Sequence, residues 1–191
     1  MQHLRPHICP FHELLPLVPH GASVMDIGCG SGLFLGLLQY YGFGIRGFGI
    51  DASHFAIDCA NAMARRNGGG HLHFEHVRKD DPWPEGQFDV VSMIDVLHHI
   101  PVEHQEGAFR AAVGRVSPGG LLLYKDMSDS PWYCAGANRL HDLVVAREWI
   151  HYVPVVVIER WAAGLRLELQ TAASFRMLWY QHDLRVFRKS A

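Results

Sequence analysis

The sequence lacks the marks of several large protein classes. Its four cysteines include no Cys-x-x-Cys pair, so zinc ribbons and iron–sulfur clusters have no support. No unbroken apolar run reaches the roughly 18 residues that a membrane-spanning helix needs. The formal net charge is only −2 at pH 7, without the basic excess typical of nucleic-acid binders. There is also no internal repeat or low-complexity tract. We therefore expect neither a membrane nor a nucleic acid as partner.

The composition is that of a folded protein. Of the 191 residues, 49% are hydrophobic and 19% charged, which is too apolar for intrinsic disorder. The first residues carry charges, histidines and prolines rather than a secretory signal, and the cysteines are scattered. This combination predicts a reduced, cytoplasmic protein. The 14 histidines are the one unusual feature, because their protonation near pH 6 changes the charge strongly.

Short apolar runs alternate with helical patterns along the chain, which predicts an α/β fold with a mainly parallel sheet. The expected strands cover residues 23–27, 45–50, 72–77, 88–94, 121–126, 165–172 and 184–188. The expected helices cover residues 33–41, 53–66, 101–116, 132–150 and 154–163. Two prolines in residues 78–87 predict a loop where a longer crossover helix might have been expected.

The clearest motif, DIGCGSG at residues 26–32, falls where the first strand gives way to a helix. Gly28 permits the tight turn, and the missing Cβ atoms of Gly30 and Gly32 let a ligand approach the backbone. The helix N-terminus offers unpaired N–H groups to a polar or anionic group. Asp51 ends the second strand, where a carboxylate can accept hydrogen bonds from both ribose hydroxyls of a nucleoside. Ser53 can cap the following helix, so Asp51 is not needed as the cap and can bind a ligand.

These features alone do not choose between a dinucleotide and another nucleoside. The dinucleotide fingerprint needs glycine at position 33, where this chain has Leu33. Asp26, two residues before the first glycine, is also foreign to that fingerprint and suits an ammonium group. A nicotinamide-dependent oxidoreductase is therefore disfavoured.

Five ordered blocks resemble the class I S-adenosylmethionine-dependent methyltransferases that act on small molecules. They are DIGCGSG at residues 26–32, GIDAS at 49–53, PWPEGQFDVV at 82–91, DVLHHI at 95–100 and SPGG at 117–120. The resemblance implies a Rossmann-like, doubly wound, seven-stranded sheet with a reversed last strand and helices on both faces. It also implies one methyltransferase domain over residues 1–191, with a lead-in at 1–22 and a substrate-covering insertion at 127–153.

The same resemblance implies S-adenosyl-L-methionine as cofactor and assigns residues to it. Asp26 lies near the amino group, Asp51 holds the ribose and Ala52 packs on the adenine. One of two acids after the third strand reads the adenine amino group, while Ile94 and Leu97 approach the sulfonium. The cofactor-binding residues so implied are Asp26, Gly28, Cys29, Gly30, Asp51, Ala52, Asp80, Asp81 and Ile94.

The acceptor side is less defined. Either His98 or His99 can serve as general base for a hydroxyl, or the two can simply shape the turn, one ring packed and the other solvated. His141, His151 and Tyr152 lie in the segment expected to cover the substrate, as do several tryptophans, which fit a core better than a site. No cluster of histidine and acidic residues at ligand spacing predicts a metal.

The sequence therefore predicts methyl transfer from S-adenosylmethionine to a small, partly apolar acceptor, with O-methylation favoured over N- or C-methylation. The alternative is a non-catalytic module of the same fold that binds the cofactor or a protein partner. Residues 94–99 lack the Asn/Asp-Pro-Pro-Tyr/Phe segment of base-modifying methyltransferases, which supports a small-molecule acceptor.

Overall fold

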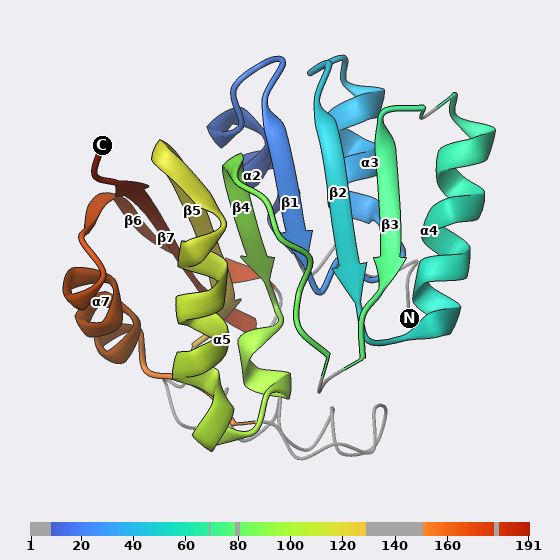
Figure 1. Cartoon of the computed structure of the whole chain (residues 1–191). Coiled ribbons are helices and arrows are strands. Elements are labelled where there is room, and N and C mark those ends of the chain that lie inside the picture. The colour runs from blue at the N-terminus through green and yellow to red at the C-terminus, as the bar shows by residue number, and fades with distance from the viewer. Residues whose placement is uncertain (1–8, 69, 79–80, 129–150, 178–179) are drawn as a thin grey trace.

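Seven strands form one sheet in the order β3-β2-β1-β4-β5-β7-β6 (Figure 1). The computed structural model describes residues 9–68, 70–78, 81–128, 151–177 and 180–191. The strands are β1 (Ser23–Ile27), β2 (Arg46–Asp51), β3 (Leu72–His76), β4 (Phe88–Ile94), β5 (Val116–Met127), β6 (Leu167–Met177) and β7 (Tyr180–Lys189). The described helices are α2 (Phe11–Leu14), η2 (Leu15–Leu17), α3 (Leu33–Tyr40), α4 (His54–Arg66), η3 (Leu97–His99), α5 (Val102–Gly114) and α7 (Val155–Gly164).

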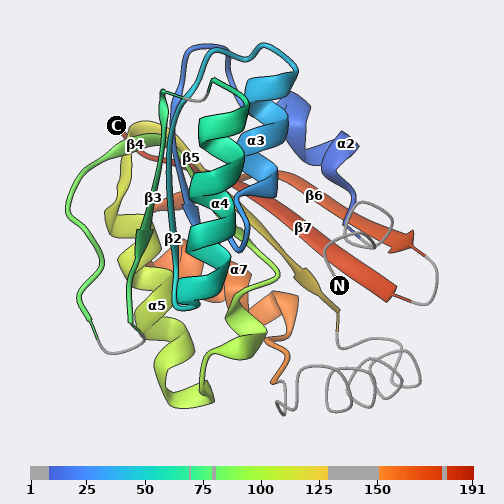
Figure 2. The same cartoon turned by 90° about the vertical axis from the view of Figure 1, so that its right-hand side faces the viewer.

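The strand directions match the predicted fold class. β1 pairs in parallel with β2 on one side and with β4 on the other, while β7 is antiparallel to both β5 and β6. The chain therefore winds outward from β1 in two directions, and β7 is the reversed last strand (Figure 2). The doubly wound, mainly parallel sheet expected from the sequence is confirmed.

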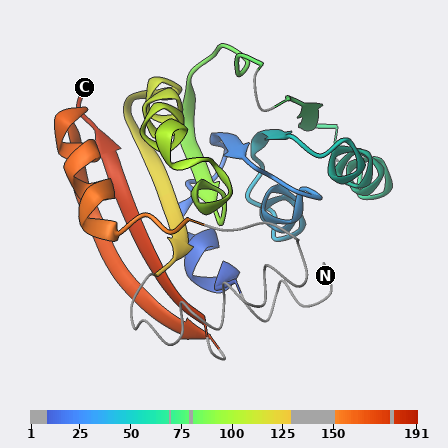
Figure 3. The same cartoon turned by 90° about the horizontal axis from the view of Figure 1, so that it is seen from below.

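Helices cover the two faces of the sheet and create two separate cores (Figure 3). On one face, α2, α3 and α4 bury residues such as Leu14, Leu35 and Ala60. On the other face, α5 and α7 bury Phe109 and Ile158 against the central strands. This helical packing, rather than propensity alone, stabilises the short helices.

The last three strands differ most from the sequence-based expectation. β5 begins at Val116 rather than Leu121, because Val116 already pairs with Phe88 and the Pro-Gly-Gly stretch is absorbed by a register shift against β4. β6 and β7 each extend beyond the predicted ranges and pair from Leu167 to Met177. The helix expected at residues 132–150 lies outside the described residues, as does most of the proposed insertion. The described part of residues 78–87 contains no helix, as the prolines predicted.

The carboxyl ends of the parallel strands meet at the lower edge of the sheet in Figure 1. The chain leaves β1 toward β2 on one side, and β4 returns on the other, so this edge has a switch point between β1 and β4. A crevice at such a point is the usual ligand site of open α/β sheets. The glycine motif follows β1 directly, so the fold brings it to this edge.

Candidate functional site

The glycine motif forms a compact turn between β1 and α3. Gly28, Gly30 and Gly32 all have positive φ angles, of 69°, 54° and 76°, which side chains rarely adopt. The Cys29 N–H donates to the Ile50 carbonyl at 3.0 Å, which ties the turn to the end of β2. The prediction of a tight glycine turn at Gly28 is confirmed.

Two of these glycines allow close protein packing. A Cβ on Gly32 would lie 2.6 Å from the Phe74 ring and 3.1 Å from Met63, so this position lets α3 approach β3 and α4. The space left by the missing Cβ of Gly32 is thus taken by Phe74, and ligand approach to the Gly32 backbone stays a prediction. A Cβ on Gly28 would lie 2.2 Å from Val96 Cγ2, so the segment after β4 packs directly on the turn.

Asp51 connects the end of β2 to the glycine turn. Its Oδ2 accepts from the Gly30 N–H and its Oδ1 from the Ser53 N–H, both at 2.8 Å. Ser53 Oγ accepts from the Ala56 N–H at 3.3 Å and caps α4, as predicted. Asp51 therefore already has two donors, yet a carboxylate has about four lone-pair sites and can still receive ribose hydroxyls.

Asp26 is a buried carboxylate at the end of β1. Only 3% of the residue is exposed, and its Oδ1 accepts from Ser92 Oγ of β4 at 2.7 Å. Asp26 lines a crevice at the switch point, together with Phe11, Gly28, Cys29, Leu33, Phe34 and Ile94. The crevice holds about 10 Å³, enough for roughly one water molecule. Phe11 and Phe34, two of its lining residues, stack with their ring centroids 6.4 Å apart.

The residues assigned to the adenine end lie at the surface or outside the described chain. Ala52 is exposed, and its carbonyl lies 3.1 Å from His76 Nε2. Asp80 is not among the described residues. Asp81 is exposed and closes a small turn, since its Oδ2 accepts from the Arg78 N–H at 3.3 Å. No described contact selects an acid for the adenine.

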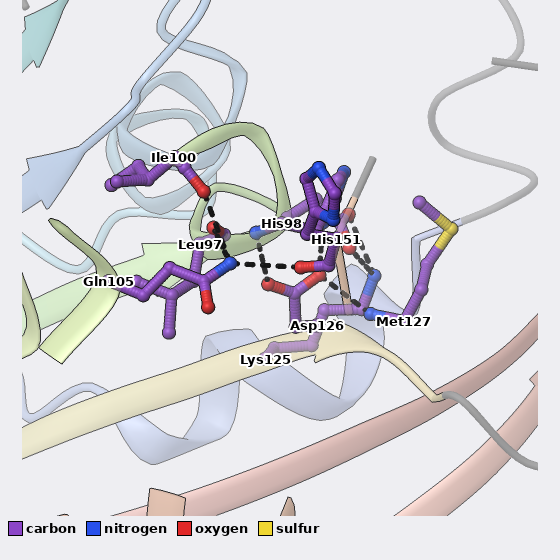
Figure 4. A network of polar contacts seen from close by, with 9 residues as sticks. Leu97, His98, Ile100, Gln105, Lys125, Asp126, Met127 and His151 are labelled. Atoms are coloured by element: carbon purple, nitrogen blue, oxygen red, sulfur yellow. Dashed lines mark hydrogen bonds and ion pairs between the residues drawn. The ribbon is translucent and has the colours of Figure 1, made fainter. Parts of the chain in front are cut away.

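His98 and His99 differ sharply in environment. His98 is 2% exposed, whereas His99 is exposed, and their rings lie 4.1 Å apart. His98 Nδ1 pairs with Asp126 Oδ1, and the His98 N–H donates to Asp126 Oδ2 at 3.3 Å (Figure 4). The Met127 N–H also donates to Asp126 Oδ1, at 2.8 Å. The structure thus gives one packed and one solvated ring, with a buried histidine–carboxylate pair.

Gln105 of α5 holds the backbone around this pair. Its Nε2 lies within hydrogen-bond distance of three carbonyls, those of Leu97 (3.2 Å), Ile100 (3.1 Å) and His151 (2.9 Å). Figure 4 shows these carbonyls converging on the one amide nitrogen. Gln105 thereby ties two separate segments, residues 97–100 and His151, together around His98.

A second buried ionic pair lies beside the first. Lys125 is fully buried, and its Nζ lies 2.7 Å from both carboxylate oxygens of Asp95. Asp95 has a φ of 55°, the left-handed region that a non-glycine residue rarely adopts. Burial alone would raise the pKa of Asp95, but Lys125, helped by His182 and His98, lowers that pKa to about 2. Asp95 is therefore ionised at neutral pH.

The predicted acceptor-side residues have mixed outcomes. His141, Trp132 and Trp149 lie outside the described residues. Trp161 of α7 packs against Phe109, as expected for a core residue. The His151 side chain is exposed, and its N–H donates to the His98 carbonyl at 3.1 Å. The half-buried Tyr152 places its ring 6.1 Å from that of His98. Leu97 was expected to face the sulfonium but packs in the core on the α5 side instead.

Sequence reasoning missed four polar residues of this site: Ser92, Asp95, Lys125 and Asp126. The one available signal was the charged pair Lys125-Asp126 at the end of an otherwise apolar strand. Within the described residues, no group of three or more histidine, cysteine or acidic side chains is arranged to hold a metal ion. Among those residues there is likewise no helix long and apolar enough to cross a membrane.

The strand order and the Asp51 carboxylate bonded to the glycine turn are those expected of a class I methyltransferase, and comparisons with known proteins indicate the same family. A family model described as a methyltransferase domain matches residues 1–172. The chain therefore belongs to the methyltransferase domain family, which confirms the resemblance noted from the sequence blocks.

Individual relatives are distant. A ubiquinone biosynthesis O-methyltransferase from Neisseria meningitidis is 26% identical over 136 residues, which are 70% of this chain and 54% of that protein. This chain thus spans about half the length of that relative.

Solved structures share the fold at low identity. The magnesium protoporphyrin IX methyltransferase from Synechocystis PCC 6803, solved with bound SAH, has a TM-score of 0.76 and 16% identity, covering 94% of this chain and 82% of that one. A 4+2 cyclase matches with a TM-score of 0.75 and 16% identity, covering 94% and 79%. Since a cyclase shares the fold, the fold alone does not define the reaction.

Proposed function

We propose that this protein transfers a methyl group from S-adenosylmethionine to the hydroxyl of a small, partly apolar acceptor. The observation that carries the proposal is the Asp51 carboxylate bonded to the Gly30 N–H at the switch point of the sheet. This arrangement suits a ribose, and the buried Asp26 carboxylate nearby suits an ammonium group. Membership of the methyltransferase family and the O-methyltransferase relatives support the same conclusion.

The buried His98–Asp126 pair supplies the base that a hydroxyl acceptor needs. The bound cofactor offers a methyl group on a good leaving group, so much of the rate comes from alignment of the acceptor. Asp126 accepts a hydrogen bond from His98 Nδ1, and in that tautomer Nε2 is the basic ring nitrogen that would take the proton of a hydroxyl. Of the two predicted histidines, His98 is our candidate base because its ring is buried and pairs with Asp126.

Calorimetry with S-adenosylhomocysteine tests cofactor binding. We expect the intact chain to bind, and Asp51→Ala to bind much more weakly because the ribose partner is removed. Asp58→Ala is the matched control, since Asp58 is an exposed acid on α4 that pairs with His54. Failure of the intact chain to bind would refute the proposal.

Turnover on a panel of simple phenols tests the base. His98→Ala should lower kcat by a factor on the order of 10² to 10⁴ while S-adenosylhomocysteine affinity changes little. His99→Ala is the neighbouring control and should retain most activity. Equal losses in both variants would contradict the assignment of His98.

The alternative function is a non-catalytic module that binds the cofactor or a protein partner. The small crevice beside Asp26 favours it, because a methionine-sized group needs more room than its volume of about 10 Å³. Binding of S-adenosylhomocysteine without turnover of any acceptor would support this alternative.

A further inference from the structure

The segment that follows β4, residues 95–98, forms ion pairs with the end of β5 on both faces of the sheet. Tyr124 packs in the core on the α5 side and Leu123 in the core on the α3 side. Because side chains alternate along a strand, Asp126 shares the face of Tyr124, and Lys125 shares the face of Leu123. Asp95 pairs with Lys125 on one face, and His98 pairs with Asp126 on the other.

Backbone bonds reinforce this double contact. The Asp95 N–H donates to the Lys125 carbonyl at 2.8 Å, and the His98 N–H donates to Asp126 Oδ2 at 3.3 Å. Val96, between Asp95 and His98, packs on Gly28 of the glycine turn. Residues 95–98 are thus bonded to β5 at both ends, while Val96 between them packs against the glycine turn.

The Asp95–Lys125 pair is costly as a purely structural device. A left-handed conformation costs most non-glycine residues on the order of 1–2 kcal/mol; aspartate and asparagine tolerate it better than most, but glycine adopts it at the lowest cost. Replacing a buried ion pair with apolar residues is often neutral or stabilising. Asp95 is also still 17% exposed, at the edge where Ile94 lines the crevice. Such strain at a site is typical of a functional role.

We propose that Asp95 and Lys125 are positioning residues for His98. Their pair holds the turn after β4 in its left-handed conformation, and that turn sets the imidazole of His98 against Asp126. The assignment of His98 as base rests on the proposed function, but the positioning itself does not. Both residues act through His98 rather than on the acceptor.

The His98 Nδ1 proton reports this positioning without any acceptor. A proton held between a buried imidazole and a carboxylate exchanges slowly and resonates far downfield in ¹H–¹⁵N spectra. The charged and titratable groups around the ring are Asp126 of β5, Asp95, His99 and Tyr152, and His182 of β7 faces Asp95. Asp126→Asn assigns the resonance, because that variant should abolish it.

We expect Asp95→Asn and Lys125→Met each to lose or broaden the His98 resonance, with the rest of the spectrum still dispersed. Asp95→Asn keeps a residue that tolerates the left-handed turn, so it remains informative where Lys125→Met does not fold. The charge-free double variant, Asp95→Asn with Lys125→Met, leaves no unpaired buried charge. It should fold and still lack the resonance. Lys189→Met is the matched control, because Lys189 bonds two carbonyls at the opposite end of the sheet.

The outcomes separate the two proposals. A sharp His98 resonance in the folded double variant would overturn the positioning role. Loss of the resonance in Lys189→Met as well would also overturn it, since the effect would then be general destabilisation. Failure of the intact chain to bind S-adenosylhomocysteine would instead refute the proposed function and leave this result standing.

Discussion

Gly32 and Gly42 have the same φ angle in different surroundings. Both have a φ of 76°, but a Cβ on Gly42 meets nothing within 4 Å, whereas one on Gly32 meets the Phe74 ring at 2.6 Å. The two glycines therefore separate the cost of an unfavourable φ from the cost of a steric clash. The glycine motif uses both properties, and only the first was evident from the sequence.

Substitution by alanine should show the difference. We expect Gly42→Ala to lower the free energy of unfolding by roughly 1–2 kcal/mol through its φ alone. Gly32→Ala should cost about 1–3 kcal/mol more, because α3 must move away from Phe74. Urea unfolding of both variants measures this. Equal losses would show that the core around Gly32 yields without cost.

At the scale of elements, Asp51 and Ser53 have different roles at the start of α4. Ser53 caps the helix, and Asp51 accepts from the Ser53 N–H and reaches back to the glycine turn. Local cap chemistry thus leaves the strand-end carboxylate oriented toward the site. This division was predictable, because a serine directly before a helical pattern is a standard cap.

Ser53→Ala should lower the free energy of unfolding by about 1 kcal/mol, because the Ala56 N–H loses its acceptor. Ser53→Gly should cost only a few tenths of a kcal/mol, since glycine is itself tolerated at this position. Thermal or urea unfolding checks the order of the two variants. A larger loss for glycine than for alanine would mean that the cap bond contributes little here.

The sequence predicted the elements whose signals are local. The strand Ser23–Ile27 follows from its apolar run. The helix Val155–Gly164 follows from a proline directly before it and a glycine at its end. The start of β5 was missed because Pro118 and Gly119 normally indicate a turn, while the structure accommodates them as an irregularity in pairing with β4. The site was only half predictable for a similar reason. The pairing of His98 with Asp126 and of Asp95 with Lys125 joins residues about thirty positions apart, which no local pattern encodes.

At the scale of the whole molecule, lowering the pH protonates the histidines and finally Asp95, and so changes the charge of the fold. Protonation of all 14 histidines would take the formal charge from −2 to +12, which disfavours the compact state. Asp95 adds a specific contribution, since Lys125 lowers the pKa of its carboxyl to about 2 against the opposing effect of burial. The folded state binds this proton more weakly than the unfolded chain does.

Asp95 should therefore stabilise the fold fully above about pH 4, by roughly 2 kcal/mol, and lose that contribution as the pH falls toward 2. Urea unfolding of the intact chain and of Asp95→Asn across this range measures the effect. We expect the difference between the two free energies of unfolding to shrink as the pH falls. Parallel pH profiles would contradict an ionised, Lys125-bound Asp95.

The two ion pairs on opposite faces of β5 also disfavour a shift in its register. If β5 slipped by one residue so that Asp126 took the place of Lys125 opposite Asp95, Met127 would lie beside His98, and Lys125 would take the place of Tyr124 in the apolar core. Two attractions would become a repulsion between carboxylates and a buried ammonium without its counter-charge. The same four side chains therefore favour the observed register of β5 over this slipped one.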